Sequence, residues 1–163
     1  MTKSNTSARS ERACLDEFLG YQRRALLGRL EGLTEVDARR SPTVSELSLL
    51  SLVKHSAIWE KRWFQVIVAG RSFPGEWPDA RTASDNTFEL TDNDTVATVI
   101  SDYREQIAAS QLVLEGSDLD ASCAFAPLAH RTVRWVVLHL IEETARHAGH
   151  ADIIRETLDG TRG

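Results

Sequence analysis

Apolar residues recur every three or four positions along four long stretches of the chain. This is the spacing of an α-helix that buries one face. The stretches cover about residues 10–30, 45–69, 94–115 and 132–158. No segment alternates in the manner of a strand, and only four prolines occur in the 163 residues. The pattern predicts an all-α fold, a single four-helix bundle with long crossover connections.

Glycines and short polar residues mark where these helices begin and end. Gly70 and Gly160 follow the second and fourth stretches, at positions where a helix C-terminus favours glycine. Ser45 is predicted to cap the N-terminus of the second helix. The connection over 70–92 is rich in proline, glycine and short polar residues, and connections of this length are usually functional or mobile. We expect a disordered N-terminal tail over 1–9 and one domain over 10–163.

Composition narrows the class of protein. Hydrophobic residues make up 42% and charged residues 26%, values typical of a globular domain. The net charge of −5 and the absence of a basic stripe argue against binding nucleic acid or an anionic membrane. Cys14 and Cys123 lie far apart and form no metal-type cluster, a pattern typical of a reduced compartment. With no apolar run of ~20 residues and no signal peptide, the expected location is the cytoplasm.

The fourth helical stretch carries the most informative chemistry. Its apolar positions fall on one narrow stripe: Val133, Val136, Leu140, Ala151, Ile154 and Leu158. Glu143 and His147 occupy the middle of that stripe, four residues apart, so they rise about 6 Å along the helix axis and can share one ion. Burying an ionised carboxylate without a partner costs several kcal/mol. A third ligand is available in His55, which lies mid-helix with Ile58 and Trp59 on its face.

Each of these residues also has a simpler interpretation. His55 by itself is typical of a hydrogen-bonded core histidine. Glu143 and His147 could form an internal ion pair, or Glu143 could pair with Arg62. His150 could replace or join His147 as a ligand. The sequence alone leaves these alternatives open.

Three segments carry a family resemblance: LLSLVKHSAIWEKRWF, GEWPD and VRWVVLHLIEETARHAGHADIIRE. They resemble the DinB superfamily, a group of metal-binding four-helix proteins that includes mycothiol-dependent maleylpyruvate isomerase and bacillithiol S-transferases. The resemblance implies a metal triad of one histidine from the second helix and two ligands four residues apart on the fourth. These positions match His55, Glu143 and His147. Many members have histidine where this chain has Glu143.

The residues and the resemblance together predict a thiol-dependent S-transferase or isomerase, or a metal-assisted hydrolase. The expected cofactors are a divalent metal, zinc or nickel, and a low-molecular-weight thiol, with a small-molecule thiol or electrophile as partner. Arg62 and Arg146 are candidates for binding the thiol's carboxylate, and Trp77 for lining the pocket. No catalytic residue is assigned beyond the metal site. The resemblance also implies a homodimer. The alternative is a non-enzymatic metal-binding stress or interaction protein.

Overall fold

A computed structural model describes residues 10–73 and 87–162. The predicted tail and Trp77 lie outside the described residues. The long helical segments are α1 (Glu11–Gly28), α3 (Leu49–Lys61) with its π-helical continuation η1 (Arg62–Val68), α4 (Val96–Glu115) and α5 (Val133–Asp159). Two short elements, α2 (Glu35–Arg39) and the 3-10 turn η2 (Ala126–Leu128), lie in the connections. The all-α prediction is confirmed.

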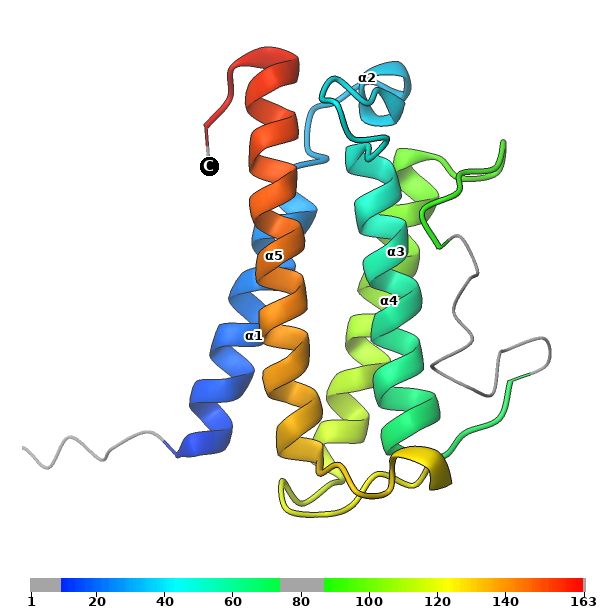
Figure 1. Ribbon diagram of the computed structural model, residues 1–163, viewed down its shortest axis with the longest axis vertical. Helices are drawn as coiled ribbons and strands as arrows, with labels where there is room; N and C mark the ends of the chain where they lie inside the picture. Colours follow the sequence, from blue (N-terminus) through cyan, green and yellow to red (C-terminus); the bar gives the residue numbers. More distant parts are fainter. Residues whose placement is uncertain (1–9, 74–86, 163) are drawn as a thin grey trace, which may run out of the picture.

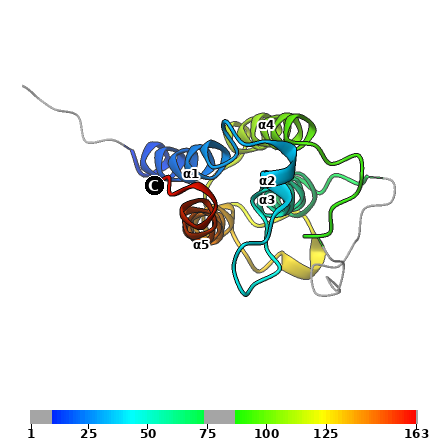
Figure 2. The same ribbon diagram turned by 90° about the horizontal axis from the view of Figure 1, so that it is seen from above.

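The bundle consists of two helix pairs. α1 packs beside α5, and α3 packs beside α4. Within each pair the helices run in the same direction, and the two pairs run in opposite directions (Figure 1). Seen from above, the four long helices surround a common centre (Figure 2). Because α3 and α4 are parallel, the connection between them must return along the length of the bundle, as the sequence predicted.

Side-chain caps set the helix starts. Ser10, Ser48, Thr95 and Thr132 each accept a hydrogen bond from the backbone N–H three residues on. The prediction that Ser45 caps the second helix is wrong. Ser48 takes that role. Its backbone N–H also donates to the Ser51 hydroxyl, so that the two serines form a reciprocal capping box. None of the helices in the described part of the chain is long and apolar enough to cross a membrane.

The helix α3 widens into a π-helix at its C-terminal end. In η1 the hydrogen bonds reach back five residues, as from the Ala69 N–H to the Phe64 carbonyl at 3.0 Å. The wider turn buries four consecutive residues, 62–65. Short π-helical segments are frequent near functional sites.

The core has two apolar clusters with a polar layer between them. One cluster includes Leu15, Leu19, Trp63, Phe64, Val113, Leu114, Val136 and Leu140. The other includes Leu26, Leu30, Leu50, Val53, Val99, Tyr103, Ala151 and Ile154. Between them each long helix contributes one buried polar residue: Arg23, Glu60, Ser110 and Thr144. We call these four residues the polar layer.

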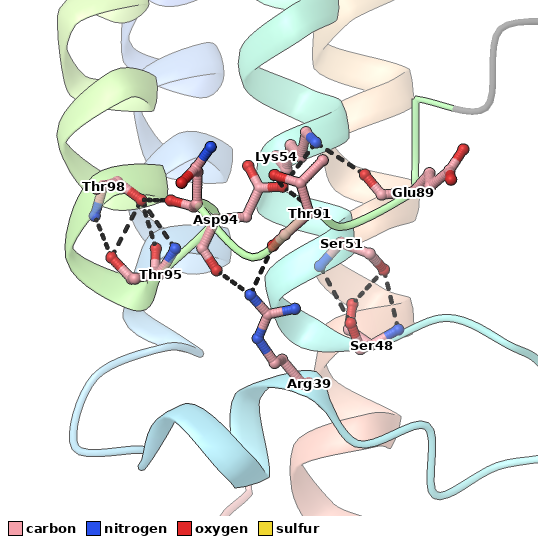
Figure 3. A network of polar contacts seen from close by, with 10 residues as sticks. Arg39, Ser48, Ser51, Lys54, Glu89, Thr91, Asp94, Thr95 and Thr98 are labelled. Carbon is pink, nitrogen blue, oxygen red and sulfur yellow. Dashed lines mark hydrogen bonds and ion pairs between the residues drawn. The ribbon is translucent and has the colours of Figure 1, made fainter.

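The returning end of the crossover connection is tied to α3 by a polar network (Figure 3). The Lys54 ammonium donates to the Asp94 carboxylate at 2.9 Å and to the Glu89 carbonyl at 2.8 Å. Arg39 donates to the Thr91 carbonyl at 2.9 Å. Burial alone would raise the pKa of Asp94, but hydrogen bonds from Thr91 and Lys54 hold it below its ordinary value. These contacts hold Glu89 and Asp94 against α3 and Thr91 against α2.

Gly70, which follows the end of η1, has a backbone conformation and a close neighbour that should both disfavour any larger residue. Its φ is +67°, and an added Cβ would lie 2.9 Å from the Cβ of Ala124. We expect Gly70→Ala to lower the free energy of unfolding by about 1–2 kcal/mol from the left-handed backbone alone, and by more because of the contact. Urea denaturation measures this change.

Gly149→Ala is the matched control. Gly149 lies on the exposed side of α5, and no heavy atom lies within 4 Å of an added Cβ. Alanine there is expected to stabilise by about 0.5–1 kcal/mol. Equal effects of the two substitutions would contradict the conformational argument for Gly70.

Candidate functional site

A cavity of about 420 Å³ lies between α3 and α5. Its inner wall consists of buried residues: Ser56, Glu60, Trp63, Leu140 and Thr144. Its outer wall consists of half-buried residues: His55, Trp59, Leu128, His139, Glu143 and His147. A concave, mostly apolar cavity with a few converging polar groups is typical of a small-molecule site. All three predicted metal ligands lie on its outer wall.

His55 is held in position by the returning end of the crossover. Its Nδ1 lies 2.6 Å from the Thr87 hydroxyl. The Phe88 ring stacks on the imidazole, with 3.9 Å between centroids and 6° between planes. When Nδ1 donates to Thr87, the lone pair of the ring lies on Nε2, which is the arrangement of a metal-binding histidine supported by an outer hydrogen bond.

His147 faces His55 across the cavity. The two ring centroids are 4.8 Å apart, edge to face. The Nδ1 atom of His147 is buried, and no hydrogen-bond partner for it exists within the described part of the chain. Leaving such a group unsatisfied costs about 1–3 kcal/mol. Burial lowers the pKa of His147, and Glu143 opposes this effect. The lowered pKa favours the neutral imidazole, which is the form that binds metal ions.

Glu143 lies on the same wall but points its carboxylate elsewhere. Its side chain is 30% exposed, and Oε1 accepts from Nη1 of Arg146 at 2.5 Å. Arg146, not Arg62, is therefore its ion-pair partner. Among residues 10–73 and 87–162, no group of three His, Cys, Asp or Glu side chains is arranged to hold a metal ion. The donor types fit a divalent metal, and Glu143 must leave Arg146 to complete the set.

The buried stripe of α5 differs in detail from the predicted one. At its middle the buried residues are Thr144 and Ala148. Glu143 and His147 lie next to them at the edge of the stripe, half-buried and facing the cavity. This placement avoids the full desolvation cost of a core carboxylate and leaves both side chains accessible to a ligand.

The remaining candidates are placed as follows. Arg62 is buried, and its guanidinium lies over the Trp59 ring at 5.3 Å, outside the cavity lining. Arg146 is exposed and also pairs with Glu142 at 2.8 Å. His150 is exposed, with its ring 6.1 Å from that of His147.

His139 is an additional histidine on the cavity wall. Its ring stands edge to face against Trp63 at 4.7 Å and stacks on Trp135 at 5.0 Å. Burial lowers its pKa, against the opposing effects of Glu143 and Glu142. These ring contacts account for its position without a ligand.

Sequence reasoning missed the buried ion pair of Arg23 and Glu60. Arg23 donates through Nε to Oε2 at 3.3 Å and through Nη2 to Oε1. The side chains are 5% and 1% exposed. Burial raises the pKa of Glu60 and Arg23 opposes the rise. The sequence did carry a signal. A positive residue interrupts the apolar stripe of one helix, where Arg23 lies between Leu19 and Leu26, and the negative Glu60 interrupts that of another.

Comparisons with known proteins agree with this architecture. A family described as mycothiol-S-transferase matches residues 14–160. The crystal structure described as the conserved protein of locus from Enterococcus faecalis superposes with a TM-score of 0.63 and 16% sequence identity. The match covers 94% of this chain and 100% of that chain, and at this identity it shows the fold alone. None of the curated proteins compared with the chain matches it.

Proposed function

Because the chain belongs to the mycothiol-S-transferase family, a DinB-like family, we propose that it is a metal-dependent S-transferase for a low-molecular-weight thiol. His55, Glu143 and His147 would hold a divalent ion, zinc or nickel. The observation that carries the site concerns the His147 ring, which contacts the His55 ring at the cavity wall. Its Nδ1 atom is buried and has no hydrogen-bond partner among the residues that the structure describes. The family match over most of the chain supports the thiol.

A bound divalent ion would supply Lewis acidity that favours the thiolate form of a thiol near neutral pH. The thiolate sulfur forms a bond to the electrophilic carbon of the second substrate. The leaving group departs with the bonding electron pair, and the proton of the thiol goes to solvent.

The protein's own residues position these reactants. Thr87 and Phe88 fix the His55 ring. Trp59 and Trp63 line the cavity with apolar surface.

Glu143 and Arg146 act as a pair in this proposal. A cation at the site would compete with Arg146 for the Glu143 carboxylate. Once Glu143 turns inward, the exposed Arg146 can pair with an anionic group of the thiol. Arg62 lies behind Trp59 and has no such role here. A homodimer and a cytoplasmic location stay predictions.

The test is metal content followed by turnover. The protein is purified without chelators, metal is quantified by mass spectrometry, and conjugation of several thiols to a chromogenic electrophile is measured before and after metal removal. We expect a retained ion and conjugation that requires both ion and thiol. Retained metal without turnover on a broad panel would favour a non-enzymatic metal-binding protein. No retained metal and no stabilisation by added Zn²⁺ or Ni²⁺ would refute the site.

Thr87→Val tests the support of His55. The change removes the hydroxyl that contacts Nδ1 and keeps the side-chain volume. Losing an outer hydrogen bond of this kind typically weakens metal binding by about 10–100-fold, and we expect a loss in that range by competitive chelator titration. Thr157→Val, at an exposed position near the end of α5, is the matched control and should leave metal affinity unchanged. Equal affinities in the two variants would contradict a supporting role for Thr87.

A further inference from the structure

A second cavity, of about 450 Å³, lies as an open groove between α1 and α4. These two helices form one side of the bundle, and α3 and α5, which enclose the first cavity, form the other (Figure 2). The two cavities share no lining residue. We call the second one the α1/α4 groove. Its ligand preference is set by different side chains from those of the proposed transferase site.

Two arginines, one from each helix, line the α1/α4 groove at about the same height. Arg12 donates to the Leu114 carbonyl at 2.9 Å, which shows the approximate register of the two helices. Since α1 and α4 run in opposite directions, Arg24, twelve residues beyond Arg12, is level with residue 102, twelve residues before Leu114. Arg104 is two residues from that level, or about 3 Å of helical rise. The two guanidinium groups can therefore reach one ligand from opposite sides.

The charges of Arg24 and Arg104 are not neutralised by a neighbouring carboxylate. Arg29 and Arg134 pair with carboxylates at 2.5 and 2.7 Å. By contrast, the exposed guanidinium groups of Arg24 and Arg104 form no ion pair or hydrogen bond among residues 10–73 and 87–162. An added Cβ on Gly20 would lie 3.2 Å from Nη1 of Arg24, so this guanidinium lies over the side of α1 that lines the groove. In a protein of net charge −5, these two cations form a local site that attracts an anion.

Apolar side chains lie beside the two arginines. Leu27 from α1 and Ile107 from α4 are half-buried and line the groove, and Gly20 adds no side chain to it. Arg23 also lines the groove, but its guanidinium is already held by Glu60. The groove thus offers apolar surface next to two exposed cations.

One carboxylate, that of Glu31, lines the same groove. Seven residues separate it from Arg24, or about 10 Å at the helical rise. This is about one Debye length at about 0.1 M salt, so screening weakens the effect of Glu31 on an anion held by the arginines. Its charge disfavours a ligand with a second negative group at that end.

We propose that the α1/α4 groove binds a small organic monocarboxylate. The carboxylate lies between Arg24 and Arg104, since a planar guanidinium forms paired hydrogen bonds with carboxylate oxygens. The apolar part of the ligand packs on Leu27 and Ile107. Inorganic phosphate would match the arginines but would leave the apolar surface uncovered, so the groove prefers an organic acid to an inorganic anion. This site is additional to the proposed transferase site and does not depend on it.

Hexanoate, 1-hexanol and inorganic phosphate are the probes that test the preference. Each is titrated into the ¹⁵N-labelled protein at constant ionic strength, and the amide shifts in two-dimensional NMR spectra give both affinity and location. Two exposed charge pairs should make hexanoate bind about 3–10-fold more tightly than hexanol, which has the same chain length. The largest shifts are expected in residues 20–27 and 104–111. Phosphate should bind more weakly than hexanoate because it buries no apolar surface.

Arg24→Gln/Arg104→Gln is the decisive variant. Both residues are exposed, so the fold should be kept, and hexanoate should bind no more tightly than hexanol. Arg40→Gln/Arg162→Gln is the matched control. It removes the same number of charges at exposed positions outside the groove and should keep the wild-type preference.

Hexanoate binding no tighter than hexanol, or the wild-type preference retained in Arg24→Gln/Arg104→Gln, would overturn the proposal. Shifts confined to the cavity between α3 and α5 would also overturn it, because they would place the ligand at the other site. Phosphate binding as tight as that of hexanoate would contradict the role of Leu27 and Ile107. No metal, thiol or turnover enters these measurements, so failure of the transferase activity leaves them unaffected.

Discussion

Arg23→Met is expected to lower the free energy of unfolding by about 3–5 kcal/mol, because it leaves the Glu60 carboxylate buried without its cation. Methionine is flexible and fills most of the space of the arginine stem, so the effect comes mainly from the lost charge. The measurement is urea denaturation followed by circular dichroism. A change below about 0.5 kcal/mol, the range of ordinary surface substitutions, would contradict the assignment of a buried ion pair.

Two controls separate charge from packing. Arg24→Met makes the same substitution at the exposed neighbouring residue and should change stability by no more than about 0.5 kcal/mol. Arg23→Met/Glu60→Met replaces both charges by apolar side chains and should recover most of the loss. A double variant as unstable as Arg23→Met would mean that packing, not the unpaired charge, sets the cost.

The same variant should change the pH dependence of stability. Burial raises the pKa of Glu60 above its ordinary 4.5, and Arg23 opposes the rise. The stability that accompanies a raised folded-state pKa is complete below the unfolded value and is lost as pH rises through the folded-state value. Without Arg23 the folded-state pKa rises further. The free energy of unfolding of Arg23→Met should therefore fall more steeply than that of the wild type as pH rises above the ordinary pKa of 4.5.

His147→Ala is expected to abolish both metal retention and thiol conjugation. The change removes the ring that faces His55, including the buried Nδ1. The loss in metal affinity should exceed the roughly 10–100-fold that follows from changing an outer hydrogen bond, because a direct ligand is removed. Metal content by mass spectrometry and the conjugation assay measure the two effects. The fold of the metal-free protein should persist, which circular dichroism checks.

Two other histidines give matched substitutions. His130→Ala changes an exposed residue in the turn before α5 and should leave metal content unchanged. His150→Ala removes the alternative ligand, whose ring lies 6.1 Å from that of His147. Loss of metal in His150→Ala together with its retention in His147→Ala would transfer the ligand assignment to His150.

The long helices were predictable from sequence because their signals are local. The apolar period of each helix spans many turns, and Gly160 has the left-handed φ of +77° expected of a C-cap. The π-helical turns of η1 were not predictable, because they depend on packing against other helices. The start of α3 was misplaced because Ser45 and Ser48 both precede apolar residues, and only the reciprocal bond with Ser51 distinguishes them.

The placement of the candidate site residues was predictable to the level of a helix face. The period of α5 places Glu143 and His147 on one side, and the structure puts both on the cavity wall opposite His55. The spacing of the apolar residues in α5 does not distinguish whether residue 143 or residue 144 is buried, because the apolar face of the helix is wider than one residue. Thr87 and Phe88 reach His55 from 32 and 33 positions away through the crossover connection. A contact of that kind has no periodic signature in the sequence.

The polar layer divides the core into two clusters, and this division affects how the protein unfolds. If η1 is counted as the end of α3, each long helix contributes buried residues to both apolar clusters, one on each side of the polar layer. A helix that leaves the core as a rigid unit therefore loses contacts on both sides of the polar layer. We expect slow amide exchange to disappear from both clusters with a similar free energy.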